Sequence, residues 1–462
     1  MKKGFASVLI VIILGCMVTL CLAFAEAGCS YCARSCAENY CILAGRSLLS
    51  EYQKELNERY GLFMLRGYDD ELSSLARFYL SADTLLSSSV LRMTCVGADV
   101  DSSEYRGLDT DLFLAQIKKL GLHEAAESAV SRNELCEGLK ITSDVPQAPS
   151  AEDLEEALDE LGSSDSAGAS ETGKPEVLER IRQAVKLLGS LRRSQKTDAV
   201  KASKKTVPAS VKKELPSQLL GYSSRNTLIS AGIADISAED FLLGEYVIGV
   251  CSNDSKKRSD TLLELETEYV IFGAASDSAN KRLAQNNLYA LRFSLNVLSI
   301  MSDPKLGSMV SSAAAVFPLI PQPLAAAAIV SIWAGIETRQ DLAVLSEGES
   351  VPVYKDASDF ATDVFAFLDK KDSAGRSAGF EGFGCYEDYL RIMLGMIPEK
   401  EKAARLMDVM QMNVSCVDGK PFSFRDYAYG FELDADFSRT HYLADPFSKG
   451  AGGHVNEVHV YR

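Results

Sequence analysis

Four cysteines lie close together near the amino terminus, directly after a long apolar run. They are Cys29, Cys32, Cys36 and Cys41, in the stretch EAGCSYCARSCAENYC. Clustered cysteines can hold a metal, exchange disulfides or pack a helix interface as small apolar side chains. At about 100° of turn per residue, Cys41 points roughly 120° away from Cys29, so one straight helix cannot surround a metal with all four. The spacing therefore favours packing or pairing between copies, and bridges to Cys95 or Cys136 stay open.

Other residues suited to catalysis or metal binding are few. The chain has four histidines, and His454 and His459 would face opposite sides of a strand, so they cannot share a metal. Asp434 and Asp436 share a strand face as a glycosidase pair could, but no sugar-binding aromatic set accompanies them. An acidic cluster lacks the spacing and central glycine of an EF-hand loop, and it comprises Asp99, Asp101, Glu104, Asp109 and Asp111. We expect no enzyme, no cofactor and no metal site.

The overall composition limits the classes of partner and the architecture. The formal net charge is -16, which argues against nucleic acid because phosphate binding needs clustered Lys and Arg on one face. The chain has 462 residues, 47% of them hydrophobic, which is enough for a membrane segment and one or two folded exterior domains. The acidity fits an exposed, soluble body.

The amino-terminal sequence predicts a membrane anchor. Residues 4–25 contain no charged side chain, and a helix needs about 20 such residues to cross a bilayer. Lys2 and Lys3 precede this run, so the positive-inside rule places the amino terminus in the cytoplasm and the bulk of the chain outside. Cleavage of a signal peptide after Ala25 is the alternative, although the apolar run exceeds the usual ~7–15 residues. We expect a single-pass protein of the cell membrane, with residues 1–25 as cytoplasmic start and anchor.

A stalk helix should follow the anchor. Residues 26–61 lack proline, and their leucines and tyrosines recur near helical spacing until Gly61 can cap the helix. Small residues along this helix would permit close approach of a second helix, so self-association through the stalk is a further expectation.

The rest of the chain divides by composition. Residues 62–141 read as a small α+β unit, with a helix over 70–86 and a strand over 90–100. Residues 142–218 read as a Ser- and Ala-rich linker that includes an amphipathic helix. Its basic end is either a flexible charged linker or a segment attracted to anionic lipid head groups or wall polymers.

Residues 219–462 read as a helix-rich distal α+β domain. The pattern predicts a strand over 262–272, a helix over 279–301 and strands near the carboxyl terminus. The uncharged stretch 306–336 is interrupted by prolines, which favours two buried helices over a membrane crossing. The expected fold class is α+β and mostly helical, with a transmembrane helix that continues into an extracytoplasmic stalk helix before the α+β body.

Several stretches resemble TadE/TadG-like proteins, a family of unknown function associated with tight-adherence (Tad) pili of Gram-positive bacteria. The likeness begins with CAEN, SEYQKEL and ERYGLF and continues through GEYVIG, ELETEYVIFG, LRFSLNVLSIMSD, YEDYLRIML and ARLMDVMQMN. The family-motif positions are Glu26, Glu38, Glu51, Tyr52, Tyr60 and Gly61. The four clustered cysteines depart from the family pattern.

The resemblance implies a membrane-anchored, extracytoplasmic structural or assembly component of a Tad-type (type IV-like) pilus or secretion apparatus. Its expected partners are the lipid bilayer and pilus or secretion-platform proteins. Two alternatives come from the residues themselves. One is a secreted or surface enzyme that acts on cell-wall glycans through carboxylates, and the other is a metal or redox sensor built on the four cysteines.

Overall fold

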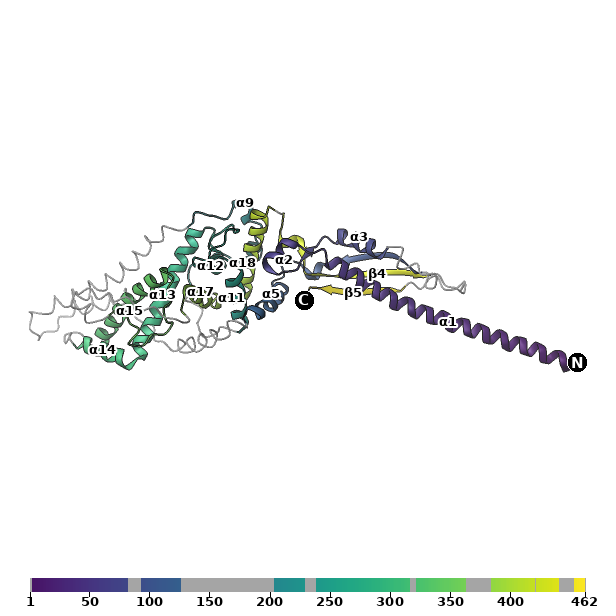
Figure 1. Ribbon diagram of the computed structural model, residues 1–462, viewed down its shortest axis with the longest axis horizontal. Helices are drawn as coiled ribbons and strands as arrows, with labels where there is room; N and C mark the ends of the chain where they lie inside the picture. Colours follow the sequence, from purple (N-terminus) through teal and green to yellow (C-terminus); the bar gives the residue numbers. More distant parts are fainter. Residues whose placement is uncertain are drawn as a thin grey trace, which may run out of the picture. The chain divides into compact units, whose positions relative to one another are not determined.

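The computed structural model describes residues 2–81, 93–125, 203–228, 238–315, 321–362, 384–419, 421–439 and 453–461 (Figure 1). The fold is mostly helical with small sheets, and a long apolar amino-terminal helix precedes an α+β body, as the sequence predicted. The chain forms two compact units. The first unit comprises residues 1–116 together with 420–462, and the second comprises residues 117–419.

Helix α1 (Lys2–Leu49) is one continuous helix that includes the whole apolar run. Among the described residues, it is the one helix that is long and apolar enough to cross a membrane, and the apolar window that qualifies it is 0% buried. A signal sequence near the amino terminus would meet the same criteria of length and composition. Figure 1 shows the amino-terminal part of α1 extending beyond the sheet of its own unit.

The prediction of one continuous stalk helix over 26–61 is wrong in one respect, because the helix breaks between Leu49 and Lys54. Helix α2 (Lys54–Tyr60) is a separate element, and Gly61 caps it in the left-handed conformation with φ 69°. The break has a physical cause. Tyr52 bridges to Leu65 as in a sheet, and the Gln53 amide donates to the Met64 carbonyl oxygen at 2.8 Å, so these backbone groups bind the next segment instead of continuing the helix.

The first unit is built on a three-stranded antiparallel sheet of order β2–β4–β5, formed by β2 (Met93–Asp101), β4 (Gly430–Arg439) and β5 (His454–Val460). A β-bulge lies between Cys95 and Gly97. Helix α3 (Asp69–Leu80) packs against β2, and α1 packs against β4 and β5. A second antiparallel pair joins β1 (Leu65–Arg66) and β3 (Tyr427–Ala428).

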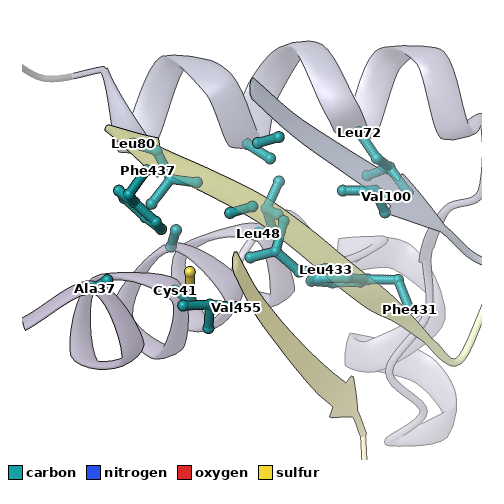
Figure 2. Close-up of a cluster of buried hydrophobic side chains, with 14 of the residues drawn as sticks. Ala37, Cys41, Leu48, Leu72, Leu80, Val100, Phe431, Leu433, Phe437 and Val455 are labelled. Atoms are coloured by element: carbon teal, nitrogen blue, oxygen red, sulfur yellow. The ribbon is translucent and has the colours of Figure 1, made fainter. Parts of the chain in front are cut away.

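Small residues of α1 form one side of the first unit's core (Figure 2). Its buried positions follow helical spacing and comprise Ala33, Ala37, Cys41, Ala44 and Leu48. They face Phe431, Leu433 and Phe437 of β4 and Val455 of β5. Because most of these α1 side chains are small, the helix can lie close to the sheet.

The domain prediction that placed 219–462 in one distal domain differs from the two observed units. Residues 427–460 supply β3, β4 and β5, which pair with strands of the first unit. The predicted 62–141 unit also differs, since the boundary between the units falls within helix α5 (Thr110–Ala125), which follows a short turn of 3-10 helix at Ser103–Tyr105. Strand pairing over more than 300 residues leaves no local trace in the sequence.

The second unit is helical in its described residues. Its helices are α9 (Ala209–Lys212), α10 (Pro216–Leu219), α11 (Ala238–Val250), α12 (Glu266–Phe272), α13 (Asp277–Ser302), α14 (Pro304–Ala314), α15 (Gln322–Ser346), α17 (Tyr386–Gly395) and α18 (Glu399–Met412). A π-helical turn at Asn413–Val417 follows α18, and a 3-10 turn at Phe424–Asp426 precedes β3 in the first unit. The uncharged stretch forms α14 and α15, which bury Val310 and Trp333 in one core, and residues 316–320 lie outside the described part.

The strand predicted over 262–272 is wrong, because this stretch contains helix α12. All seven residues of α12 are buried, so its apolar and polar positions show no single-sided pattern that would identify a helix. Its carboxylates accept hydrogen bonds inside the protein. Glu266 Oε2 accepts from the Ser252 amide at 2.9 Å, and Glu268 Oε1 accepts from the Tyr386 hydroxyl at 2.9 Å.

The carboxyl-terminal part of the predicted linker 142–218 is folded. Val207 and Leu215 are buried, and the Ser217 amide donates to Asp408 Oδ1 of α18 at 2.8 Å. The amphipathic helix predicted within this linker lies outside the described residues.

Candidate functional site

The candidate site is α1 and the sheet end that contacts it. Side chains of residues 7–25 are exposed, and Glu26, the first charged residue after the apolar run, is the first half-buried side chain. Glu26 Oε1 lies 3.1 Å from Nη2 of Arg439, the last residue of β4. Arg439 Nη1 also donates to the Ser30 hydroxyl at 2.6 Å. Sequence reasoning identified Glu26 but missed Arg439, because 413 positions separate the two residues.

The four clustered cysteines do not share one environment. Cys41 is fully buried in the core against the sheet, and Cys36 is half-buried against the same cluster. Cys29 is half-buried and Cys32 is exposed. All four are free thiols, and no cluster of three or more His, Cys, Asp or Glu side chains suited to a metal occurs among the described residues. The predicted partner Cys95 is half-buried beside the core that holds Cys41, whereas Cys136 lies outside the described residues.

Burial and neighbouring groups should make Cys41 less reactive than the exposed Cys32. Burial, followed by the nearby Cys95 and Glu457, raises the pKa of Cys41 to about 12. Since the thiolate is the reactive form, we expect Cys41 to resist a thiol-alkylating reagent in the folded protein while the exposed Cys32 is modified. Peptide mass spectrometry after brief alkylation measures both sites at once. Equal modification of Cys41 and Cys32 in the native chain, without denaturant, would contradict the buried position.

Gly45 permits a close approach between α1 and the His459 side chain of β5. A Cβ atom at this position would collide with the His459 imidazole ring, which is tilted against Phe431 with ring centroids 5.4 Å apart. His459 is buried, and burial lowers the pKa of its imidazole below the ordinary value. His454, by contrast, is exposed on the other face of β5 beside Asp436, as alternation along a strand requires.

Replacing Gly45 with alanine should loosen the contact between α1 and the sheet. We expect a cost of roughly 1–3 kcal/mol, typical of overpacking, and faster alkylation of Cys41 as the core opens. A Cβ atom at Gly28 on the same helix would meet no atom within 4 Å, so Gly28→Ala is the matched control and should leave Cys41 protected. Chemical denaturation followed by Cys41 alkylation measures both variants. Indistinguishable Gly45→Ala and Gly28→Ala proteins would refute the close approach.

The remaining family-motif positions have structural contacts. Glu38 Oε1 lies 3.3 Å from Arg34 Nε on the exposed face of α1. Glu51 accepts from the Tyr79 hydroxyl at 3.3 Å, and Tyr52 meets the ring of Phe63 edge-on at 5.0 Å. Tyr60 is buried and ends α2 before the Gly61 cap. Glu51, Tyr52 and Tyr60 lie at the turn after α1, whereas Glu38 pairs within the helix, so these residues do not converge on one site.

The acidic residues considered for calcium or glycan chemistry are engaged in local structure. Asp99 binds Arg77, and Asp101 accepts from the Ser103 amide at 2.8 Å. Asp109 accepts from the Asp111 amide at 2.8 Å at the start of α5. Asp434 and Asp436 share the exposed face of β4, where both lie near His454 at 3.5 and 3.1 Å. This face is an open sheet surface and offers no described cleft.

The second unit contains a buried ionic network that sequence reasoning missed. Asp341 of α15 bridges two cations, with Arg292 Nη2 at 2.7 Å and Lys355 Nζ at 2.5 Å. Lys355 Nζ also lies 2.5 Å from Glu337, and the four side chains are at most 1% exposed. Burial raises the pKa of Asp341, but the charges of Arg292 and Lys355 outweigh this and lower it below the ordinary value. A signal was present, because Arg292 interrupts the apolar face of its helix.

A buried carboxyl group lies on α12, and a second, on α18, contacts α12. Burial raises the pKa of Glu268 to about 7, and its Oε2 has no hydrogen-bond partner. Burial likewise raises the pKa of Asp408 to about 7, although Asp408 accepts from the Ser217 amide and from the Tyr269 hydroxyl at 2.9 Å. One open hollow of about 420 Å³ in the second unit is lined by Asn226, Arg282, Leu283 and Asn286 and contains neither carboxyl.

Comparison with known proteins gives one assignment. The model of a family of unknown function, DUF5702, matches residues 169–439, which is more than half of the chain. No curated protein and no solved structure matches. The matched range spans most of the second unit and reaches the end of β4, whereas α1 lies before it. The family description names no pilus, so the likeness to Tad-associated proteins stays a prediction.

Proposed function

This chain belongs to DUF5702, a family of unknown function, and we propose that it is a membrane-anchored extracytoplasmic component that builds or assembles a Tad-type pilus or secretion apparatus. One observation carries the proposal. The apolar run of α1 is uncovered by the rest of the described chain and continues without a break into the helix turns that form the core of the first unit.

The length of the apolar run suits a bilayer. Residues 4–25 would extend about 33 Å as a helix, close to the roughly 30 Å of a hydrocarbon core. Burying such a run in lipid removes a large apolar surface from water. Lys2 and Lys3 at the amino-terminal end favour the cytoplasmic side, which supports an exterior location for both folded units.

The connection between anchor and body is rigid. No linker separates the apolar run from the packed turns of α1, so a force on the anchor passes directly to the sheet. Beyond the run, α1 keeps the apolar side chains of Tyr31 and Leu43 exposed, one on each side of the stripe that packs against the sheet. These side chains support a lateral contact with a partner helix or a second copy, as expected for a structural component.

Deletion of the gene and complementation in the native bacterium test the proposal. We expect the deletion to abolish Tad-type surface filaments or secretion through the associated machine, and the unmodified gene to restore them. A chain with Ile10→Lys and Leu14→Lys should leave the membrane fraction and fail to complement, because a lysine near the centre of a membrane helix costs roughly 2.5–3.5 kcal/mol.

The matched control places the same charges on exposed positions of α1 beyond the apolar run. Tyr31→Lys with Leu43→Lys should remain in the membrane fraction, so a complementation defect in this variant would identify the lateral contact. Electron microscopy of the cells and immunoblotting of sheared filaments provide the readouts. Normal filaments and normal secretion in the deletion strain would reject the proposed function.

A further inference from the structure

The ion pair between Glu26 and Arg439 fixes where the sheet lies relative to the apolar run. Glu26 follows the last apolar residue, Ala25, and its carboxylate lies 3.1 Å from Arg439 Nη2. Arg439 ends β4 and pairs with Met93, the first residue of β2. Thus the same end of two neighbouring strands lies at the level at which α1 leaves its apolar run.

That level coincides with the surface of a bilayer. The 22 residues from Gly4 to Ala25 span about 33 Å as a helix, slightly more than a hydrocarbon core of roughly 30 Å. Glu26 therefore lies at the outer boundary of the hydrocarbon when α1 crosses the membrane. The headgroup layer on each side is roughly 5–7 Å thick, which is about the rise of two strand residues.

Arg439 is held to α1 by two contacts at this level. Its side chain is buried, Nη2 forms the ion pair with Glu26, and Nη1 donates to the Ser30 hydroxyl at 2.6 Å. These contacts fix the end of β4 against the first turn of α1 beyond the apolar run. The position of α1 in the bilayer therefore sets the level of this end of the sheet.

We propose that the end of the sheet formed by the carboxyl end of β4 and the amino end of β2 rests in the phospholipid headgroup layer. The inference rests on the proposed function, since it requires α1 to cross the membrane. The sheet of the first unit then stands upright on the membrane, with Arg439 at its base and Glu432 further from the lipid along β4.

Tryptophan quenching in vesicles tests this placement. The full chain is reconstituted into vesicles of phosphatidylcholine and phosphatidylglycerol, with or without phosphatidylcholine that carries a nitroxide on its headgroup. The native chain has one tryptophan, Trp333, which is buried and provides a constant background. Three single replacements each add one tryptophan at an exposed position, namely Thr94→Trp, Val458→Trp and Tyr31→Trp.

Thr94 and Val458 form a matched pair on the outer face of the sheet. Thr94 is opposite Ser438, next to Arg439, and Val458 is opposite Glu432, so about 20 Å of strand separates the two levels. We expect the nitroxide lipid to quench most of the emission that Thr94→Trp adds and little of the emission that Val458→Trp adds. Equal quenching at the two positions would overturn the inference.

Tyr31→Trp separates failure of the inference from failure of the proposed function. Tyr31 lies on α1 about 7 Å beyond Glu26 and reports whether the helix crosses the membrane at all. Quenching of Tyr31→Trp without quenching of Thr94→Trp would leave the anchor intact and reject the resting place of the sheet. Absence of quenching at both positions, with release of the protein by alkaline carbonate, would reject the anchor itself.

Discussion

Replacing Asp341 with alanine should strongly destabilise the second unit. The carboxylate holds Arg292 at 2.7 Å and Lys355 at 2.5 Å, and all three side chains are at most 1% exposed. Its loss leaves two buried cations with one remaining carboxylate, that of Glu337. Breaking a buried ionic network in this way costs about 3–5 kcal/mol. Urea unfolding followed by Trp333 fluorescence measures the effect, because this tryptophan lies on α15 of the second unit.

The control for this variant is an exposed ion pair of the same unit. Lys257 Nζ lies 3.6 Å from Glu264, and the lysine side chain is 56% exposed. Lys257→Ala should change the unfolding free energy by less than about 1 kcal/mol. If Asp341→Ala and Lys257→Ala shift the urea midpoint equally, the network does not hold α13, α15 and the segment around Lys355 together.

The second unit should lose stability as the pH rises from about 4.5 to about 7. Burial raises the pKa of Glu268 from 4.5 to about 7 and that of Asp408 from 3.8 to about 7. In this window the folded protein keeps protons that the unfolded chain has released, so rising pH favours unfolding. The stabilising contribution is fully present below the ordinary values and is lost at about pH 7. Each group contributes on the order of 3 kcal/mol.

The groups around Glu268 and Asp408 determine which substitution isolates the pH dependence of stability. Glu268 faces Tyr386 and Asp254, and Lys281 binds Asp254 at 2.9 Å. Asp408 faces Tyr269, Ser217 and Arg405. Glu268→Gln keeps the shape and cannot ionise, so its urea midpoint should fall less steeply with pH than that of the unmodified protein. The same slope in both proteins would show that Glu268 is already ionised throughout the window.

Long elements with local signals could be predicted from the sequence. The helix expected over 279–301 is α13 (Asp277–Ser302), whose Ser276 side chain accepts from the Ala279 amide at 3.3 Å. Asp303 and Pro304 end it and begin α14, as an N-cap followed by proline should. The strand expected over 90–100 is β2, because its β-forming residues alternate between the core and the solvent.

Elements without a local signal were missed or misassigned. Helix α12 is buried on every side, so the residue pattern that distinguishes a helix from a strand is absent. The break after Leu49 depends on the backbone of Met64 and Leu65, which the sequence of the stalk does not reveal. The sheet of the first unit depends on pairing between residues near 95 and near 435, and such pairing leaves no periodicity in either segment.

The candidate site could be predicted in part. Helical geometry separated Cys41 from Cys29, Cys32 and Cys36, and the structure places Cys41 alone among them in the fully buried core. The prediction did not reveal which face of the helix meets the sheet, because that depends on Phe437 and Val455 far along the chain. Arg439 was missed for the same reason, since a single arginine after a strand carries no signal of its partner.

The pairing of β2, near the amino terminus, with β4, near the carboxyl terminus, also sets the order in which the first unit can fold during synthesis. The ribosome releases α1, α3 and β2 first, but the strands that cover their apolar side emerge only after the whole second unit. Until then Ala37, Cys41 and Leu48 have no β4 or β5 to pack against. A truncated translation product would leave this side of α1 uncovered, so the first unit can be completed only after synthesis has reached the final strands.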